Sequence, residues 1–144
     1  MGQAPTSDSG TPAPGRTGLG AVLEAMRPAH WIKNAFVAAP LLFSGRFTDP
    51  ASWALCGAAF AAFCLLSSAV YLLNDLWDRP ADRMHPVKRL RAIASGRLPA
   101  AAAYAAAGVL LATGLAIVAA VQADIRPREH LMGGYALAAW AVAY

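Results

Sequence analysis

The chain has 144 residues, of which 58% are hydrophobic and only 14% are charged, and its formal net charge is +4. Ordinary soluble domains carry about 25% charged residues, so this composition excludes a typical soluble domain, and it is too apolar for a disordered chain. No Asp, Glu, Lys or Arg occurs between Pro50 and Asn74 or between Leu98 and Ala123. Each stretch exceeds the ~20 apolar residues that cross a bilayer as a helix, so we predict an integral membrane protein.

Four apolar segments follow an N-terminal stretch, residues 1–18, whose Pro, Gly, Ser and Thr content predicts a disordered tail. We expect the segments to be membrane helices over about residues 29–44, 52–73, 98–121 and 130–144. Pro40 interrupts the first segment, whereas the Ala and Gly content of the third suits close helix packing in lipid. The fourth is still apolar at Tyr144, so we expect residues 19–144 to be the N-terminal part of a longer membrane domain.

The basic residues indicate how these segments are oriented. The loop at 79–97 holds six of the twelve Lys and Arg residues. The positive-inside rule therefore predicts that this loop lies in the cytoplasm, and the N-terminus with it. Nucleic-acid binding requires a soluble basic face with interleaved aromatic residues, which the sequence lacks, so we expect no nucleic-acid partner. The expected environment is the lipid bilayer, because the apolar segments are long enough to span it.

Acidic residues gather at the end of the second segment. Asp75, Asp78 and Asp82 follow Asn74, and with Tyr71 they fall within one arc of about 100° on a helix. The position of Asp82 is provisional, since Pro80 intervenes. Three acids on one stripe repel one another, so a positive partner is expected.

The acidic stripe allows two interpretations. Oxygen ligands favour a hard cation, and Mg²⁺ binds through one or two carboxylates together with water and substrate phosphates. Alternatively, the acids are solvated interfacial groups that pair with Arg79 and Arg83. The basic residues that follow, Lys88, Arg89 and Arg91, are suited to holding phosphate oxygens, or they serve only as a cytosolic anchor.

The spacing Asn74-Asp75-x-x-Asp78-x-x-x-Asp82 resembles the first Asp-rich motif of the UbiA superfamily of intramembrane prenyltransferases. Two flanking stretches are similar to its decaprenyl-phosphate phosphoribosyltransferase branch, namely residues 27–34 (RPAHWIKN) and 85–96 (HPVKRLRAIASG). The resemblance covers about residues 20–144. One departure is Ala92, where the branch often has Pro.

This resemblance implies an all-α, polytopic bundle of nine membrane helices in a bacterial plasma membrane, about four of them present here. The implied reaction is a Mg²⁺-dependent transfer of 5-phosphoribosyl from phosphoribosyl pyrophosphate to a polyprenyl phosphate, for arabinan synthesis in the cell envelope. Metal–pyrophosphate binding is assigned to Asn74, Asp75, Asp78 and Asp82, with the three aspartates as catalytic residues. Substrate binding is assigned to Lys33, Tyr71, Asn74, Lys88, Arg89 and Arg91. Whether the protein forms a homo-oligomer is left open by the resemblance.

Two other functions fit part of the pattern. One is an aromatic prenyltransferase of the same superfamily, such as one acting on 4-hydroxybenzoate, and the other is a non-catalytic or transport fragment whose acids line an ion path. Lys88-Arg89-x-Arg91 followed by Ile93-Ala94-Ser95-Gly96 favours the phosphoribosyl branch. Because the superfamily's second polar motif would lie beyond Tyr144, we expect the 144-residue chain alone to be inactive.

Overall fold

The computed structural model describes residues 18–46 and 48–125, and all regular structure within these ranges is helical. The elements are α1 (Leu19–Ala25), η1 (Pro28–Ala38), α2 (Ala39–Phe43), α3 (Pro50–Trp77), α4 (Arg79–Met84), η2 (Lys88–Leu90) and α5 (Ala100–Ile125). The predicted all-α class is therefore confirmed. The fourth predicted segment, 130–144, and residues 1–17 of the predicted tail lie outside the described residues.

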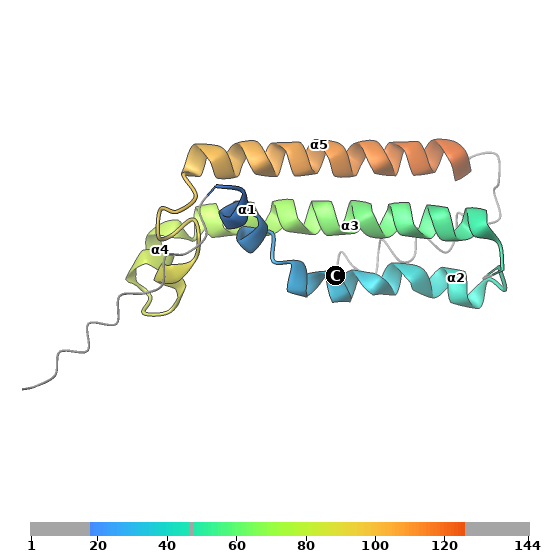
Figure 1. Ribbon diagram of the computed structural model, residues 1–144, viewed down its shortest axis with the longest axis horizontal. Coiled ribbons are helices and arrows are strands. Elements are labelled where there is room, and N and C mark those ends of the chain that lie inside the picture. The colour runs from blue at the N-terminus through green and yellow to red at the C-terminus, as the bar shows by residue number, and fades with distance from the viewer. Residues whose placement is uncertain (1–17, 47, 126–144) are drawn as a thin grey trace, which may run out of the picture.

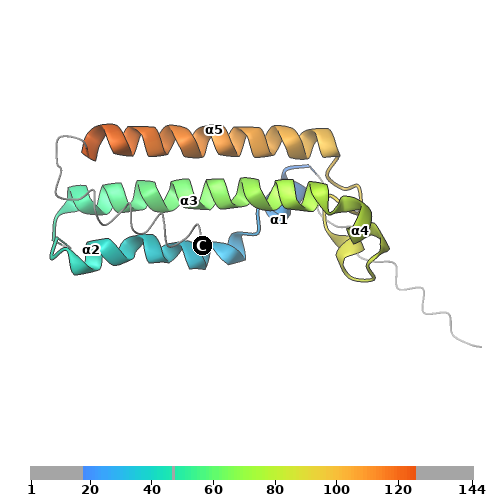
Figure 2. The ribbon, with the colours of Figure 1, turned by 180° about the vertical axis from the view of Figure 1, so that it is seen from behind.

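Helix α3 forms the centre of the arrangement (Figure 1). Helix α5 runs along one of its sides, and η1 with α2 runs along another, as the view from behind also shows (Figure 2). Helix α1, helix α4 and the connection that leads to α5 gather at the end where α3 finishes. We call α1 together with residues 79–99 the cap.

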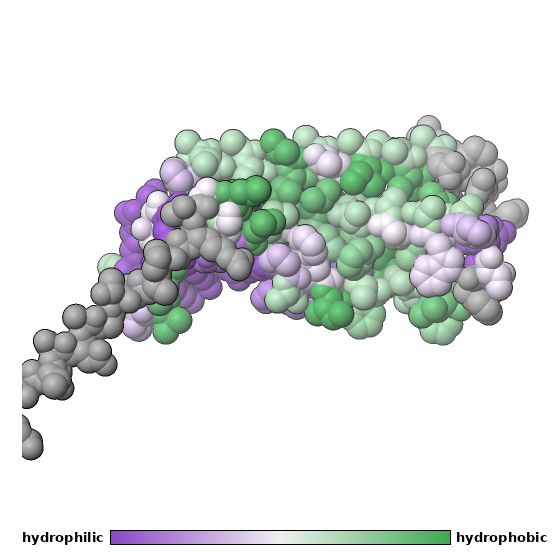
Figure 3. Space-filling model, viewed as in Figure 1, coloured by the Kyte–Doolittle hydropathy of each residue, from purple (hydrophilic) through white to green (hydrophobic). Residues whose placement is uncertain are grey.

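Two of the helices, α3 and α5, are long and apolar enough to cross a membrane. Hydrophobic residues cover most of the face over these helices, whereas hydrophilic residues gather on the cap (Figure 3). The cap therefore lies where a membrane surface would meet water if both helices span the bilayer.

Helix α3 extends beyond the predicted segment, 52–73, at both ends. Asp49 caps its start, because its Oδ1 accepts a hydrogen bond from the Ala51 main-chain N–H (3.1 Å), and Pro50 occupies the first helical position. At the other end, the break expected from Pro80 is confirmed, since α3 stops at Trp77 and α4 starts at Arg79.

Backbone hydrogen bonds nevertheless continue across this break. The Asp78 N–H donates to the Asn74 carbonyl (2.9 Å), and the Asp82 N–H donates to the Asp78 carbonyl (2.8 Å). Because this four-residue pattern persists, the last turn of α3 and the first turn of α4 keep a nearly common side-chain register.

The first predicted segment, 29–44, has an unexpected helix type. It forms the 3₁₀ helix η1, which ends at Ala38, and then α2, whose second residue is Pro40. Residues three apart lie above one another in a 3₁₀ helix. Trp31, Asn34 and Val37 therefore share one face, of which Asn34 and Val37 are buried. Pro40 lies just after the change of helix type.

The close helix packing predicted for the third segment is confirmed at Gly114 of α5. A Cβ atom at this position would lie 2.8 Å from Cγ of Leu66 on α3, closer than real Cβ atoms approach other atoms. The missing side chain therefore lets α3 and α5 approach each other, as small residues do in membrane helix pairs.

The basic loop between α3 and α5 is folded around its own apolar residues. A turn at Gly96, with φ of +83°, returns the Leu98 N–H to the Ala92 carbonyl (2.9 Å). Ile93 is fully buried in a core that joins the cap to the long helices. The buried core residues are Ala21, Ala25, Met26, Leu72, Leu76, Ala92, Ile93, Leu98, Ala103 and Ala107.

Candidate functional site

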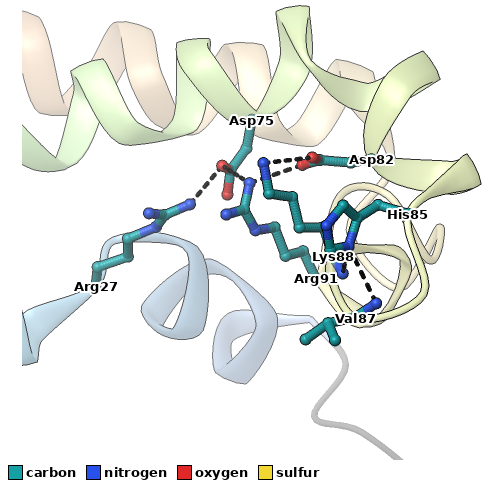
Figure 4. Close-up of polar contacts among 7 residues, drawn as sticks. All are labelled: Arg27, Asp75, Asp82, His85, Val87, Lys88 and Arg91. Carbon is teal, nitrogen blue, oxygen red and sulfur yellow. Dashed lines mark hydrogen bonds and ion pairs between the residues drawn. The ribbon is translucent and has the colours of Figure 1, made fainter.

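Two buried carboxylates face one arginine at the junction of α3 and the cap (Figure 4). Asp75 lies in the last turn of α3 and Asp82 lies in α4, and their side chains are only 7% and 3% exposed. Nη1 of Arg91 is 3.3 Å from Oδ1 of Asp75 and 2.7 Å from Oδ2 of Asp82. Arg91 therefore pairs with both acids at once.

Two further cations complete the cluster. Nη2 of Arg27, at the start of η1, lies 2.6 Å from Oδ1 of Asp75. Nζ of Lys88, in the loop, lies 4.0 Å from Oδ1 of Asp82. Burying two carboxylates is costly unless they are paired, so three cations from two separate segments explain how both acids are tolerated.

Aromatic rings lie beside the same cluster. The guanidinium carbon of Arg27 is 5.1 Å from the centroid of the Tyr71 ring, which is a cation–π distance. The His30 ring packs against Tyr71 with centroids 5.5 Å apart. Tyr71 precedes Asp75 by one helical turn, so it supports Arg27 next to that carboxylate.

Two polar contacts between η1 and α3 fix the direction from which Arg27 reaches the acids. Nε1 of Trp31 donates to Oγ of Ser68 (3.1 Å), and Nδ2 of Asn34 donates to Oγ of Ser67 (3.3 Å). The stretch at 27–34 that carries part of the family resemblance therefore sends three side chains to α3.

The other predicted site residues do not join the carboxylate pair in this structure. Asn74 and Asp78 are exposed, at the opposite edge of the predicted stripe from Asp75 and Asp82. Lys33 and Arg89 are also exposed, and within residues 18–46 and 48–125 neither forms an ion pair with the acids. No three His, Cys, Asp or Glu side chains of the described residues are grouped to hold a metal ion. The arrangement is therefore a two-carboxylate site.

The alternative pairing of the acids with Arg79 and Arg83 is wrong. Nε of Arg83 donates to the Ala94 carbonyl (3.1 Å), and Nε of Arg79 is buried with no hydrogen-bond partner in the described part of the chain. The acids are instead reached by cations from α1's end and from the loop, because the loop folds back over them.

Sequence reasoning missed Arg27 as a member of the site. One signal was available, since the positive-inside rule puts both Arg27 and the acids on the cytoplasmic side of the membrane. That rule predicts only the side of the membrane. The contact itself depends on how η1 packs against α3.

A second missed feature is a clamp between α1 and the loop. Nη1 and Nη2 of Arg97 bind Oε2 and Oε1 of Glu24, each at 2.7 Å, and Nη2 also donates to the Leu90 carbonyl (2.7 Å). The hydrogen bond with Glu24 raises the pKa of the Arg97 guanidinium above its ordinary value. These partners are 73 residues apart, so no local pattern reveals them.

The donor chemistry fits a divalent cation held together with an anionic phosphate ligand. Mg²⁺ commonly binds through one or two carboxylates, with waters and phosphate oxygens completing its shell. Asp75 and Asp82 supply two carboxylates that already converge on one positively charged atom. Guanidinium and ammonium groups around them are suited to phosphate oxygens.

The chain is similar to one family of known proteins. The model of the UbiA prenyltransferase family matches residues 34–143. The chain is 42% identical over 113 residues to a decaprenyl-phosphate phosphoribosyltransferase of Mycolicibacterium smegmatis, covering 74% of this chain and 35% of that protein. It is 46% identical over 99 residues to the Mycobacterium tuberculosis protein of the same name, covering 66% and 33%.

A third relative has a different name. The chain is 48% identical over 75 residues to nodulation protein NoeC of Azorhizobium caulinodans, covering 52% of this chain and 24% of that protein. The chain spans about a third of the length of the two phosphoribosyltransferases and about a quarter of NoeC.

Proposed function

The chain belongs to the UbiA prenyltransferase family, a family of helical membrane proteins, and on that premise we propose that its carboxylate pair serves phosphoribosyl transfer. The donor is phosphoribosyl pyrophosphate, the acceptor is a polyprenyl phosphate, and the reaction depends on Mg²⁺. Relatives named decaprenyl-phosphate phosphoribosyltransferase support this choice. The single observation that carries the proposal is that Arg91 contacts two buried carboxylates, beside which two further cationic side chains lie.

The metal ligands in this proposal are Asp75 and Asp82, and the family resemblance adds Asn74 and Asp78. When bound, Mg²⁺ neutralises the negative charge that develops on the leaving pyrophosphate. Asp75 and Asp82 are mostly shielded from water, so their interaction with a bound cation is stronger than it would be in bulk solvent.

The remaining polar residues bind and orient the two phosphate-bearing substrates. Lys88 and Arg91 bind pyrophosphate oxygens, and Tyr71 lies near the sugar. Lys33 and Arg89, exposed in this structure, bind further phosphate oxygens.

In the reaction itself, the bond between the anomeric carbon and the pyrophosphate oxygen breaks. Pyrophosphate leaves with the electron pair, and an oxygen of the lipid phosphate forms the new bond to carbon. The attacking phosphate is already anionic, so no general base is needed, and the protein's task is positioning and electrostatic stabilisation.

In this proposal the protein lies in a bacterial plasma membrane with its N-terminus and cap in the cytoplasm. The six basic residues at 79–97 favour this orientation. It places the carboxylate pair where a water-soluble sugar donor and a lipid phosphate both reach it. The lipid-linked product would supply arabinan synthesis.

The test uses membranes from cells that express the complete gene. These membranes receive ribose-labelled phosphoribosyl pyrophosphate, decaprenyl phosphate and Mg²⁺, and the expected result is label in the lipid fraction with equimolar pyrophosphate release. A second arm supplies a polyprenyl diphosphate with 4-hydroxybenzoate. Product in that arm alone would favour an aromatic prenyltransferase, and pyrophosphate release in neither arm would contradict both enzyme functions.

A further inference from the structure

The arginines of the cluster occupy one oxygen of each buried carboxylate. Nη1 of Arg91 lies between Oδ1 of Asp75 and Oδ2 of Asp82, and Nη2 of Arg27 contacts the same Oδ1 of Asp75 (Figure 4). Mg²⁺ binds oxygen at about 2.0–2.1 Å. A metal ion held by these same two oxygens therefore cannot coexist with Arg91 in its present position.

Asp75 is carried by a different element from both arginines. Asp75 belongs to α3, whereas Arg27 lies between α1 and η1, and Arg91 lies in the cap, as Asp82 does. The clamp between Glu24 and Arg97 joins α1 to that loop. The buried cluster that contains Met26 and Ile93 joins them as well and also includes Leu76 of α3, so the backbones that carry the arginines and Asp75 are fixed in one packed core. An exchange of partners therefore falls to the long arginine side chains, which are 26% and 30% exposed.

The backbone at Arg27 is also unusual. Among the described residues it is the only non-glycine residue with positive φ, at φ 53° and ψ 59°. Such a conformation persists only where the surroundings impose it, and it occurs often at ligand sites. Here it coincides with the 2.6 Å contact to Asp75 and the packing over Tyr71.

We propose that Arg27 and Arg91 are exchangeable counter-cations of the carboxylate pair. Without a ligand they neutralise Asp75 and Asp82. When a divalent cation enters with a diphosphate, the cation takes the carboxylate oxygens, and the guanidinium groups bind diphosphate oxygens instead. Every buried charge then keeps a partner in both states. This inference rests on the proposed function, and it adds Arg27 to the residues that bind the substrate.

If the arginines exchange with the cation in this way, one arginine-to-glutamine substitution should change two binding affinities in opposite directions. Removing a guanidinium removes a competitor, so the free divalent cation should bind more tightly. The same substitution removes a phosphate partner, so the metal–diphosphate complex should bind more weakly. A purely structural ion pair, or an arginine that only binds phosphate, does not give both changes.

The experiment uses the protein expressed from its complete gene and placed in lipid nanodiscs. Mn²⁺ alone is titrated and followed by the electron paramagnetic resonance signal of the free ion, and Mg²⁺–pyrophosphate is titrated by calorimetry. For Arg27→Gln and Arg91→Gln we expect Mn²⁺ to bind about threefold to tenfold more tightly. We expect Mg²⁺–pyrophosphate to bind about tenfold to a hundredfold more weakly.

Arg79→Gln is the matched control, because it removes the same charge at the same end of α3 without a contact to either acid in the described residues. It should change Mn²⁺ affinity by less than about twofold. If Arg27→Gln fails to fold, Arg91→Gln still tests the exchange, and Arg27→Lys should keep Mn²⁺ affinity close to that of the unsubstituted protein.

The outcomes separate this inference from the function on which it rests. If the unsubstituted protein binds both probes but neither glutamine variant gains Mn²⁺ affinity, exchange is overturned and the metal–diphosphate site stands. If Arg79→Gln gains as much Mn²⁺ affinity as the other two, a general charge effect replaces exchange. If the unsubstituted protein binds neither probe, both proposals are overturned.

Discussion

The two ends of α3 each carry an aspartate, and the two carboxylates have very different partners. Asp49 accepts hydrogen bonds from the Ala51 N–H (3.1 Å) and the Ser52 hydroxyl (2.7 Å), both within three residues. Asp75 is bound by Arg27 and Arg91, which are 48 and 16 residues away. The first carboxylate starts its own helix, whereas the second joins three segments of the chain.

This difference shows what a buried charge requires in such a fold. A helix cap works with any side chain that accepts the same short-range hydrogen bond. A buried carboxylate with two guanidinium partners depends on the position of each segment, and removing one partner leaves an uncompensated charge. We therefore expect function to be sensitive at the Asp75 end and insensitive at the Asp49 end.

Replacing each aspartate by asparagine should produce the largest contrast. Asp75→Asn removes a proposed metal ligand and should lower phosphoribosyl transfer by at least about a hundredfold. Asp49→Asn should leave transfer unchanged, since asparagine caps a helix as well as aspartate does. Transfer is measured in membranes with equal amounts of inserted protein. Equal losses in the two variants would remove the functional distinction between the two ends.

The same contrast explains which features the sequence predicts. Local signals give the end of α3 before Pro80 and the close packing of the third segment, which the structure shows at Gly114. The cap at Asp49 and Pro50 is a local signal as well, but the predicted segment starts two residues later, at 52. Helical periodicity places Asp75 and Asp82 at neighbouring positions of one stripe, and the structure finds both of them buried.

Features that depend on tertiary packing were not predicted. The 3₁₀ form of η1 leaves no simple sequence signature, and it decides which residues of the first segment face α3. The contact of Arg27 with Asp75 follows from that packing. The loop at 79–97 was recognised by its six basic residues, yet its core is Ile93 between two alanines, because charge counting overlooks three buried apolar residues.

Charge-conserving substitutions in the loop should lower phosphoribosyl transfer less than Asp75→Asn does. Arg91→Lys keeps the positive charge but loses the planar group that bridges two acids, so transfer should fall about tenfold to a hundredfold. Arg89→Lys should have a smaller effect, since exposed Arg89 does not contact either acid in the described residues. The measurement is steady-state kinetics with varied phosphoribosyl pyrophosphate.

Normal insertion of both variants is checked with a reporter in each loop, because lysine and arginine count equally for topology. If Arg91→Lys keeps full activity, Arg91 acts only as an anchor. If Arg89→Lys is the more damaging variant, the phosphate contact lies at Arg89.

Loosening the clamp should have the smallest effect. Glu24→Gln weakens a partly exposed pair, so it should lower the free energy of unfolding by only about 0.5–1 kcal/mol. The substitution should still raise the KM for phosphoribosyl pyrophosphate a few-fold, because the pair of Glu24 with Arg97 joins α1 to the loop that carries Arg91. Asp49→Ala is the control, since the lost cap should destabilise by about 1 kcal/mol without changing KM. Parallel KM changes in both variants would point to stability alone.

The most direct test of the account is the position of the bound metal. The crystal structure of the complete protein would be determined in complex with Mn²⁺ and pyrophosphate. The metal ion would be located by its anomalous scattering. We predict the ion within about 2.1 Å of carboxylate oxygens of both Asp75 and Asp82, with Arg91 moved onto the pyrophosphate. A metal bound elsewhere, with Arg91 still bridging the two carboxylates, would contradict the central claim that this pair is the cation site.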